Sequence, residues 1–261
     1  MKSSSYDAIA VIVYQHSMPW LDVTLSALLT YKNEHKLGII LVENIPNSSE
    51  GSKAAARAFV PLYLKKTGCH ARIINCNISK IADPGARHAG GLAAGYAQAK
   101  EAPKVLFMDS DCIPIRDGWL DRMFDADADI VGPPSFHNLP DYTIPHAHPS
   151  LLLFNSELAG PPYWNGSFLQ VRRHPDTGVK IFWDVCIGFT HRVGSRPDVS
   201  LKKLPQRCCT GHGYEYYRID DIAIHMRGTT NVTKRKYPKD QKRGLLVLPE
   251  FNFYKQHTVK P

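Results

Sequence analysis

The stretch AIAVIVYQHSMPWLDVTLSALLTYKNEHKLGIILV, residues 8–42, decides the fold class of this chain. Residues 8–14 form a nearly continuous apolar run rich in β-branched side chains, which is typical of a strand buried on both faces. Residues 20–31 then place leucines at helical spacing, and a second apolar run occupies residues 38–42. This succession predicts a strand, a helix and a second strand parallel to the first.

The same alternation continues through the first half of the chain. Residues 54–66 and 85–99 are predicted helices, and residues 71–76 and 104–108 are predicted strands. The sequence therefore predicts an α/β fold with a mainly parallel sheet flanked by helices. Ligands of such sheets gather beyond the carboxyl ends of the strands. The polar residues that directly follow the strands are Gln15, His16, Glu43, Asn44 and Asp109 to Asp111.

The amino-acid composition of the sequence changes near Pro133. The segment FHNLPDYTIPHAHPS, residues 136–150, is rich in Pro and His and is typical of a long surface loop. The remainder mixes short strand-like and helix-like stretches. We expect one domain over residues 1–261, with a first half at about 6–132, a mixed second half at about 133–233 and a basic C-terminal extension at about 234–261.

Asp109-Ser110-Asp111 follows an apolar strand-like run. Alternation along an extended chain points its two carboxylates to a common side. Mg²⁺ and Mn²⁺ prefer oxygen ligands and commonly bridge carboxylates to substrate phosphates. A bare Asp-x-Asp is frequent by chance, but its place at the end of a strand favours a site for one of these cations.

The segment GARHAGG, residues 85–91, opens a predicted helix. Arg87 beside small residues at a helix start is a candidate phosphate ligand. The alternative is that the glycines allow the helix to pack closely on the sheet. The segment does not match GxGxxG, which disfavours a dinucleotide-binding site.

Two further residues are candidates for chemistry. Asp184, in the apolar setting WDVCIGF (residues 183–189), suits a general base whose desolvation tunes its pKa, or alternatively the N-cap of the helix that follows. His225 ends a strand-like run and precedes a Gly-Thr-Thr loop, so it is a candidate metal or phosphate ligand. A lone histidine is more often structural.

Charge and cysteine usage bear on partners and location. The net charge of +8 and the pI near 9.1 indicate an anionic partner, which could be a nucleotide, a nucleic acid or an acidic membrane surface. The six cysteines show no CxxC pair, which favours reduced thiols and a cytoplasmic protein. No stretch approaches the roughly 20 apolar residues of a spanning helix. The basic C-terminal stretch leaves peripheral contact at the inner membrane face open.

In order along the chain, six segments resemble family 2 of the glycosyltransferases, which have the GT-A fold. They are VIVYQHSMP (11–19), LVEN (41–44), ADPGARHAGG (82–91), FMDSD (107–111), WNGSFLQVRR (164–173) and WDVCIGF (183–189). The resemblance covers roughly Tyr6 to Thr230. The chain departs from the family at Tyr14, Gln15 and His16, where Pro-Thr-Tyr-Asn is usual, and at Trp183, where the family often has Glu.

The resemblance implies a metal-dependent, inverting hexosyl- or related transferase that moves a sugar from a nucleotide diphosphate to an acceptor hydroxyl. Asp184 would be the catalytic base, Asp111 a direct metal ligand, Asp109 a ligand of the metal or the ribose, and His225 a further metal ligand. Donor contacts would come from Tyr14, Gln15, His16, Glu43, Arg87, Asp109, Ser110, Asn165 and Gly166. The first half would bind the donor, with a UDP-sugar as the default, and the second half a glycan or other hydroxyl acceptor.

Two alternatives remain open from the sequence. A sugar nucleotidyltransferase shares a metal-binding acidic pair, but it normally carries a Gly-rich loop with Lys or Arg after its first strand, and residues 15–20 contain neither. A sugar transferase acting on modified DNA would use the basic balance of the chain to hold a polyanion. No recognised nucleic-acid-binding motif accompanies that charge.

Overall fold

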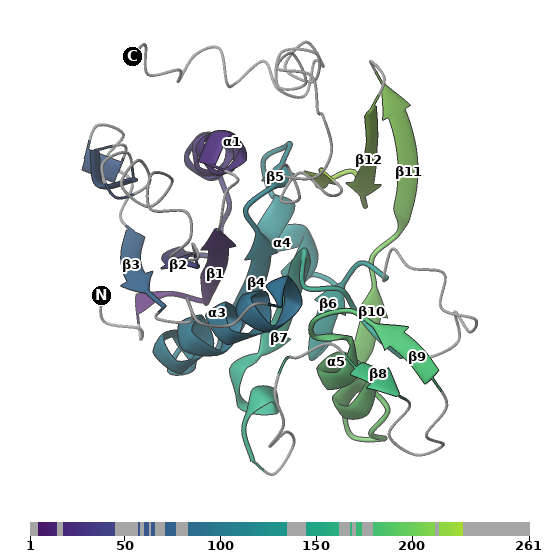
Figure 1. Cartoon of the computed structure of the whole chain (residues 1–261). Coiled ribbons are helices and arrows are strands. Elements are labelled where there is room, and N and C mark those ends of the chain that lie inside the picture. The colour runs from purple at the N-terminus through teal and green to yellow at the C-terminus, as the bar shows by residue number, and fades with distance from the viewer. Residues whose placement is uncertain are drawn as a thin grey trace.

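A seven-stranded sheet runs through the middle of the fold, described here by a computed structural model (Figure 1). Its strands lie in the order β10 (Leu201–Lys203), β6 (Ile130–Gly132), β7 (Leu151–Asn155), β4 (Lys104–Asp109), β1 (Ala8–Tyr14), β2 (Leu37–Glu43) and β3 (Ala71–Asn75). β7 pairs antiparallel with β4 and β6, and the other pairings are parallel. The predicted α/β class with a mainly parallel sheet flanked by helices is confirmed.

The structure describes part of the chain. The described residues are 5–14, 18–44, 57, 60–62, 64–65, 71–76, 83–134, 145–161, 168, 171–173, 180–211 and 214–226. Their helices are α1 (Met18–Thr30), α3 (Pro84–Ala99), α4 (Trp119–Phe124) and α5 (Ile187–Gly194), with a 3-10 turn, η3, at Ser156–Ala159. Residues 57, 60–62 and 64–65 are also helical, within the predicted helix 54–66. The predicted extension 234–261 lies outside the described residues.

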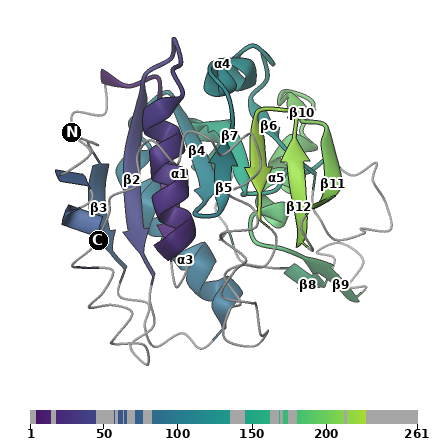
Figure 2. The same cartoon turned by 90° about the horizontal axis from the view of Figure 1, so that it is seen from above.

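The central sheet is covered on both faces. Every residue of β1 is buried as a result. Alternate side chains of β1 enter two separate cores. Ile12 packs with Leu21 of α1 in one core, which α4 also joins. Val11 packs with Leu92 of α3 in the other core, which includes Phe189 of α5. Figures 1 and 2 show α1 and α3 on opposite sides of the sheet.

Helix α3 approaches the sheet closely through glycines. Asp83 caps its start, with the Asp83 carboxylate accepting a hydrogen bond from the Ala86 N–H at 2.7 Å, and Pro84 occupies its first turn. A Cβ placed on Gly91 would lie 2.8 Å from Cγ1 of Val13, and one on Gly95 would collide with Val11. Close packing of helix on sheet is therefore one role of the glycines in this helix.

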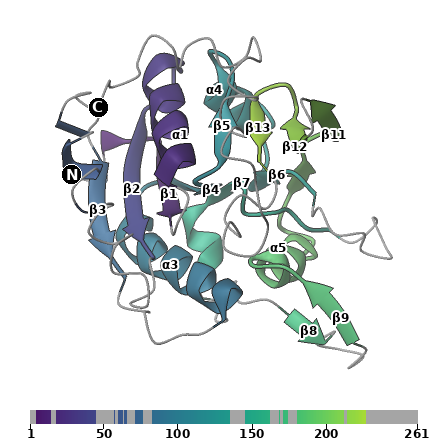
Figure 3. The same cartoon turned by 45° about the horizontal axis from the view of Figure 1, so that its top comes forward.

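A second sheet of four antiparallel strands lies beside α1 (Figure 3). Its order is β11 (Gln206–Gly211), β12 (Tyr214–Ile219), β13 (Ala223–His225) and β5 (Cys112–Pro114). Val23 of α1 packs against Ile113 and Ile224 of this sheet, so α1 is held between the two sheets. β8 (Val171–Arg173) and β9 (Lys180–Trp183) form a separate antiparallel pair.

The segment around residues 133–150 is a loop where it is described, but the prediction that it lies on the surface is wrong for residues 146–150, which are buried. Residues 133–134 and 145–150 carry neither helix nor strand, and residues 135–144 lie outside the described part. Strands on both sides of this loop, β4 and β7 among them, belong to one sheet. Among the described helices, none has the length and apolar character needed to cross a bilayer.

Candidate metal and catalytic site

The two sheets meet at Asp109 and Asp111. Asp109 is the last residue of β4, Asp111 lies in the turn that follows, and Cys112 begins β5. β13 pairs with β5 so that His225 lies opposite Cys112. The fold thereby brings together the three residues expected from the sequence to hold a metal.

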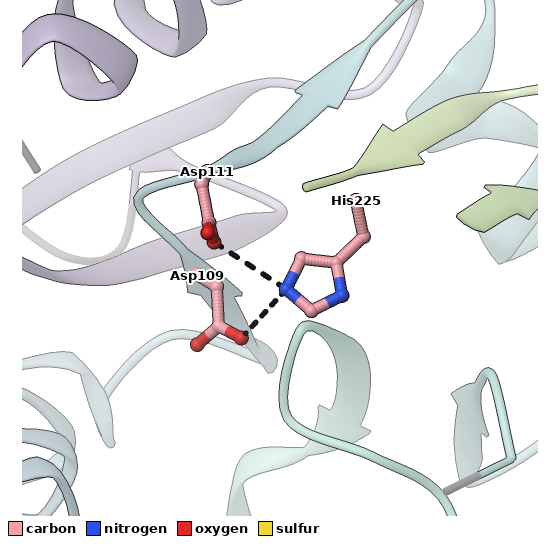
Figure 4. Close-up of side chains that lie close together, drawn as sticks. All are labelled: Asp109, Asp111 and His225. Carbon is pink, nitrogen blue, oxygen red and sulfur yellow. Dashed lines mark ion pairs between the residues drawn. The ribbon is translucent and has the colours of Figure 1, made fainter. Parts of the chain in front are cut away.

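The three side chains point toward one another (Figure 4). The Nε2 atom of His225 lies 3.3 Å from Oδ2 of Asp109 and 3.3 Å from Oδ1 of Asp111. One ligand atom from each residue lies within 4.8 Å of the other two. Asp111 and His225 are 3% and 6% exposed, so these polar groups are almost completely removed from water.

Burial and pairing act against each other at these groups. Burial raises the pKa of Asp109, but the hydrogen bond from His225 and the nearby His88 and His148 outweigh it and lower that pKa to about 2. Burial lowers the pKa of His225, but the charges of Asp111 and Asp109 and their hydrogen bonds raise it to about 10. A protonated His225 therefore bridges two carboxylates at neutral pH.

The donor set fits a divalent cation. Two carboxylate oxygens suit Mn²⁺ and Mg²⁺, and the imidazole nitrogen is a softer ligand that Mn²⁺ accepts more readily than Mg²⁺. A cation bound here would take the place of the proton on Nε2 of His225 and keep both carboxylates compensated. Without a proton on His225 or a bound cation, burial of the Asp109 and Asp111 carboxylates would cost roughly several kcal/mol per charge.

His88 adds a contact that was not identified from the sequence. It lies on α3, and its Nε2 is 3.4 Å from Oδ1 of Asp109. The two oxygens of Asp109 thus face different histidines, His88 and His225. His88 stands beside Arg87 in the segment already singled out, so its position near the helix start was the available signal.

The backbone of the turn between β4 and β5 accepts or donates hydrogen bonds from three directions. The buried hydroxyl of Thr24 on α1 lies 2.9 Å from the carbonyl oxygen of Ser110. The Asp109 N–H donates to the Ser150 carbonyl at 3.1 Å, and the Met226 N–H donates to the Asp111 carbonyl at 3.0 Å. These contacts fix the backbone that carries the two carboxylates.

Asp184 lies in the turn between β9 and α5, with 26% of its side chain exposed. Its Oδ1 accepts a hydrogen bond from the Val185 N–H at 2.7 Å, and its Oδ2 lies 3.6 Å from Nε2 of His148. The N-cap of α5 is Cys186, whose φ is 65°. The alternative interpretation of Asp184 as the helix N-cap is therefore wrong.

His148 reaches the site because β7 runs against the other strands. Residues that precede an antiparallel strand lie at the same edge as residues that follow a parallel one. His148 stands three residues before β7, and its ring centroid is 6.2 Å from that of His225. His148 was not identified from the sequence because only the polar residues that directly follow strands were considered as site residues.

The expected donor-binding residues on β1 and β2 are placed side by side. Tyr14 and Glu43 are Cα partners at the ends of the two strands. Tyr14 is 1% exposed, and burial, followed by the charge of Glu43, raises the pKa of its hydroxyl. Arg57, which was not identified from the sequence, forms a two-point ion pair with Glu43, with Nη2 to Oε1 at 3.1 Å and Nε to Oε2 at 3.3 Å.

The remaining expected residues divide into described and undescribed ones. Arg87 is half-buried in the first turn of α3, where its N–H donates to the Asp83 carbonyl. Ser110 is 2% exposed. Gln15, His16, Asn165 and Gly166 lie outside the described residues.

Comparison with known proteins gives distant structural similarities. No protein-family description and no curated protein matches the chain. Among solved structures, the mannosyltransferase PcManGT from Pyrobaculum calidifontis, in complex with GDP-Man and Mn²⁺, is similar at 14% identity and a TM-score of 0.42, covering 59% of this chain and 46% of that one. S. aureus TarS residues 1–349 in complex with UDP-GlcNAc gives 13% identity and a TM-score of 0.39 over 59% of this chain and 46% of that one.

A third similar structure is GalNAc-T7 with UDP, GalNAc and Mn²⁺, at 14% identity and a TM-score of 0.38. The match covers 49% of this chain and 23% of that one. The chain thus spans less than half the length of each of these three proteins. At these identities and TM-scores the likeness assigns neither a family nor an activity to the chain.

Proposed function

We propose that this chain is a metal-dependent glycosyltransferase of the GT-A type, which uses a nucleotide-diphosphate sugar as donor. The observation that carries the proposal is the convergence of Asp109, Asp111 and His225 at the carboxyl edge of a parallel sheet. That edge is where α/β sheets bind ligands. The order of the sequence segments that resemble family 2 supports the same assignment.

The proposed roles follow from the positions of the residues. Asp109, Asp111 and His225 hold Mn²⁺ or Mg²⁺, which when bound neutralises charge on a departing diphosphate. Arg87, at the start of α3, lies where a phosphate group also gains from the helix N-terminus. Tyr14 and Glu43 border the place proposed for the base and ribose of the donor, a UDP-sugar by default.

Asp184 is the proposed catalytic base. It is partly exposed and lies near the metal cluster, because Nε2 of His148 is 3.6 Å from Oδ2 of Asp184 and the ring centroid of His148 is 6.2 Å from that of His225. Asp184 would remove the proton of the acceptor hydroxyl as that oxygen attacks the anomeric carbon from the face opposite the diphosphate. Displacement in one step would invert the anomeric configuration.

The acceptor and the cellular location belong to the same proposal. A glycan or another hydroxyl compound is the proposed acceptor, and the cytoplasm, with contact at the inner membrane face, is the proposed location. Transfer to modified DNA is a subordinate alternative that rests on the net charge of +8. DNA binding that weakens steeply with salt would favour it, and no binding at low salt would remove it.

Calorimetric titration with UDP, GDP, dTDP and CDP, each with and without Mn²⁺, tests the proposal. We expect one nucleotide to bind in a Mn²⁺-dependent manner, and Asp111→Asn to weaken that binding by about 100-fold or more because it removes a charged metal ligand. Asp198→Asn is the matched control, because Asp198 is an exposed carboxylate paired only locally, with Arg196. Binding of no nucleotide, or equal binding by both variants, would contradict the proposal.

A further inference from the structure

We infer that His148 is a positioning residue that orients the carboxylate of Asp184 for proton removal. The inference rests on the proposed function, in which Asp184 is the base. Its starting point is the separation of 3.6 Å between Nε2 of His148 and Oδ2 of Asp184. Hydrogen bonds at catalytic groups are commonly long before substrate binds and shorten in the complex.

The backbone of Ser150 determines which nitrogen of His148 carries a proton. The Ser150 N–H donates a hydrogen bond to Nδ1 of His148 at 3.2 Å. A ring nitrogen that accepts a hydrogen bond has no proton, so in the neutral ring the proton is on Nε2. His148 therefore presents an N–H donor to the carboxylate of Asp184.

The ring of His148 is also held in place. The side chain is 5% exposed, and the His148 N–H donates to the Pro133 carbonyl at 2.8 Å. Ser150, which contacts Nδ1, also accepts the hydrogen bond from the Asp109 N–H. A continuous series of contacts thus runs from Asp109 through Ser150 and His148 to Asp184.

Each oxygen of the Asp184 carboxylate faces one N–H group. Oδ1 accepts from the Val185 N–H, and Oδ2 faces Nε2 of His148. Each oxygen keeps a second lone pair, so one remains available for an acceptor hydroxyl. Because His148 acts through Asp184, its loss is expected to slow turnover without weakening donor binding.

Two substitutions separate the functions of the two ring nitrogens. His148→Gln places an amide N–H near the position of Nε2 and keeps the donor to Asp184. His148→Asn keeps an acceptor near Nδ1 for Ser150 but lacks a donor that reaches Asp184. The substrates for the assay are nucleotide sugars that carry the base identified by calorimetry. The rate is the Mn²⁺-dependent release of nucleoside diphosphate, with water as the acceptor.

We expect His148→Asn to lower kcat about tenfold or more and His148→Gln to stay within about threefold of wild type, because loss of an orienting partner commonly costs 10- to 100-fold. The KM for the donor should not change in either variant. Equal losses in the two variants, no loss in His148→Asn, or a loss confined to KM would overturn the inference. His35→Gln and His35→Asn are matched controls, because His35 pairs with Asp121 in another part of the fold.

A third variant and a spectrum separate this inference from the function it rests on. Asp184→Asn should lower kcat by about 100-fold or more, and full activity in that variant would reject the base while leaving the Mn²⁺ and nucleotide site intact. Two-bond ¹H–¹⁵N NMR of histidine-labelled protein, with His148 assigned through His148→Gln, reads the ring directly. Protonated Nε2 with unprotonated Nδ1 is the expected result, and a proton on Nδ1 would overturn the inference without reference to activity.

Discussion

Glu43 and Asp109 end the two strands that flank β1, at the same edge of the sheet, yet their carboxylates have different partners. Glu43 forms a two-point ion pair with Arg57, whereas Asp109 faces His225 and His88. A guanidinium is always charged and has no lone pair, but an imidazole loses its proton and then binds a cation. We therefore expect the same sequence feature, a carboxylate after an apolar strand, to give one permanent ion pair and one exchangeable site.

The largest expected effect tests whether the Asp109 site is exchangeable. Mn²⁺ must displace the proton from His225, whose pKa is raised from 6.5 to about 10. We expect the apparent affinity for Mn²⁺ to rise about tenfold per pH unit between about pH 6.5 and 8.5, because one proton is released per ion bound. Calorimetry in buffers of different ionisation enthalpy measures that proton. His225→Gln should flatten the pH dependence, and an affinity independent of pH in wild type would contradict the comparison.

The same pKa values determine how the stability of the metal-free protein changes with pH. His225 has a raised pKa, so its ion pairs contribute fully below pH 6.5 and are lost as the pH rises through about 10. Asp109 has a lowered pKa, so its contribution is present above 3.8 and is lost as the pH falls toward about 2. Stability is expected to fall at both ends of this range.

The next effect in size tests whether the Glu43 pair is permanent. Arg57→Met leaves a carboxylate that is 4% exposed without its charged partner, and we expect a loss of about 2 kcal/mol in the free energy of unfolding. Urea unfolding at pH 7 measures it. The affinity for Mn²⁺ should not change, because Glu43 is separate from the metal cluster.

A matched ion pair serves as the control for Arg57→Met. Arg196 and Asp198 form a similar two-point pair, with both contacts at 3.1 Å, but on the exposed surface. Arg196→Met should destabilise the protein measurably less than Arg57→Met, because solvent screens exposed pairs. Equal losses would show that burial of Glu43 adds nothing.

The smallest expected effect concerns the support of the Asp109 site. Thr24→Val removes the hydroxyl that contacts the Ser110 carbonyl while conserving shape. We expect a loss of about 1 kcal/mol in the free energy of unfolding, with a weaker affinity for Mn²⁺. Thr30→Val is the control, since the Thr30 hydroxyl bonds to Ser26 within the same helix. A change in metal affinity in Thr30→Val, but not in Thr24→Val, would contradict this role.

Local patterns predicted most of the described first half of the fold. The predicted strand 8–14 coincides with β1, and the predicted helix 85–99 differs from α3 by one residue. Asp109, Asp111 and His225 were expected as metal ligands, and the structure brings them together. The agreement at β1, α3 and Asp109 has one cause, because apolar periodicity and the ends of parallel strands can be read within a short window of sequence. His225 ends an antiparallel strand, β13, so its place beside Asp109 depends on the pairing of β13 with β5.

The residues that were missed depend on contacts between distant segments. His148 lies near Asp184 because β7 is antiparallel, and strand direction is not encoded in the local pattern of residues 151–155. Arg57 pairs with Glu43 from a separate helical segment. Thr24 reads as an ordinary helix residue until α1 is placed against the turn after β4. Tertiary packing, rather than local propensity, assigns their roles.

The hydrogen bond between the His148 N–H and the Pro133 carbonyl has an evolutionary consequence. It closes the base of the connection between β6 and β7, which pair with each other. Ala147, which lies between these two anchors, is completely buried, and the Thr190 hydroxyl bonds to both its N–H and its carbonyl oxygen. Homologous chains are therefore expected to change little at the residues directly before His148, because a larger side chain or an inserted residue there would displace buried contacts.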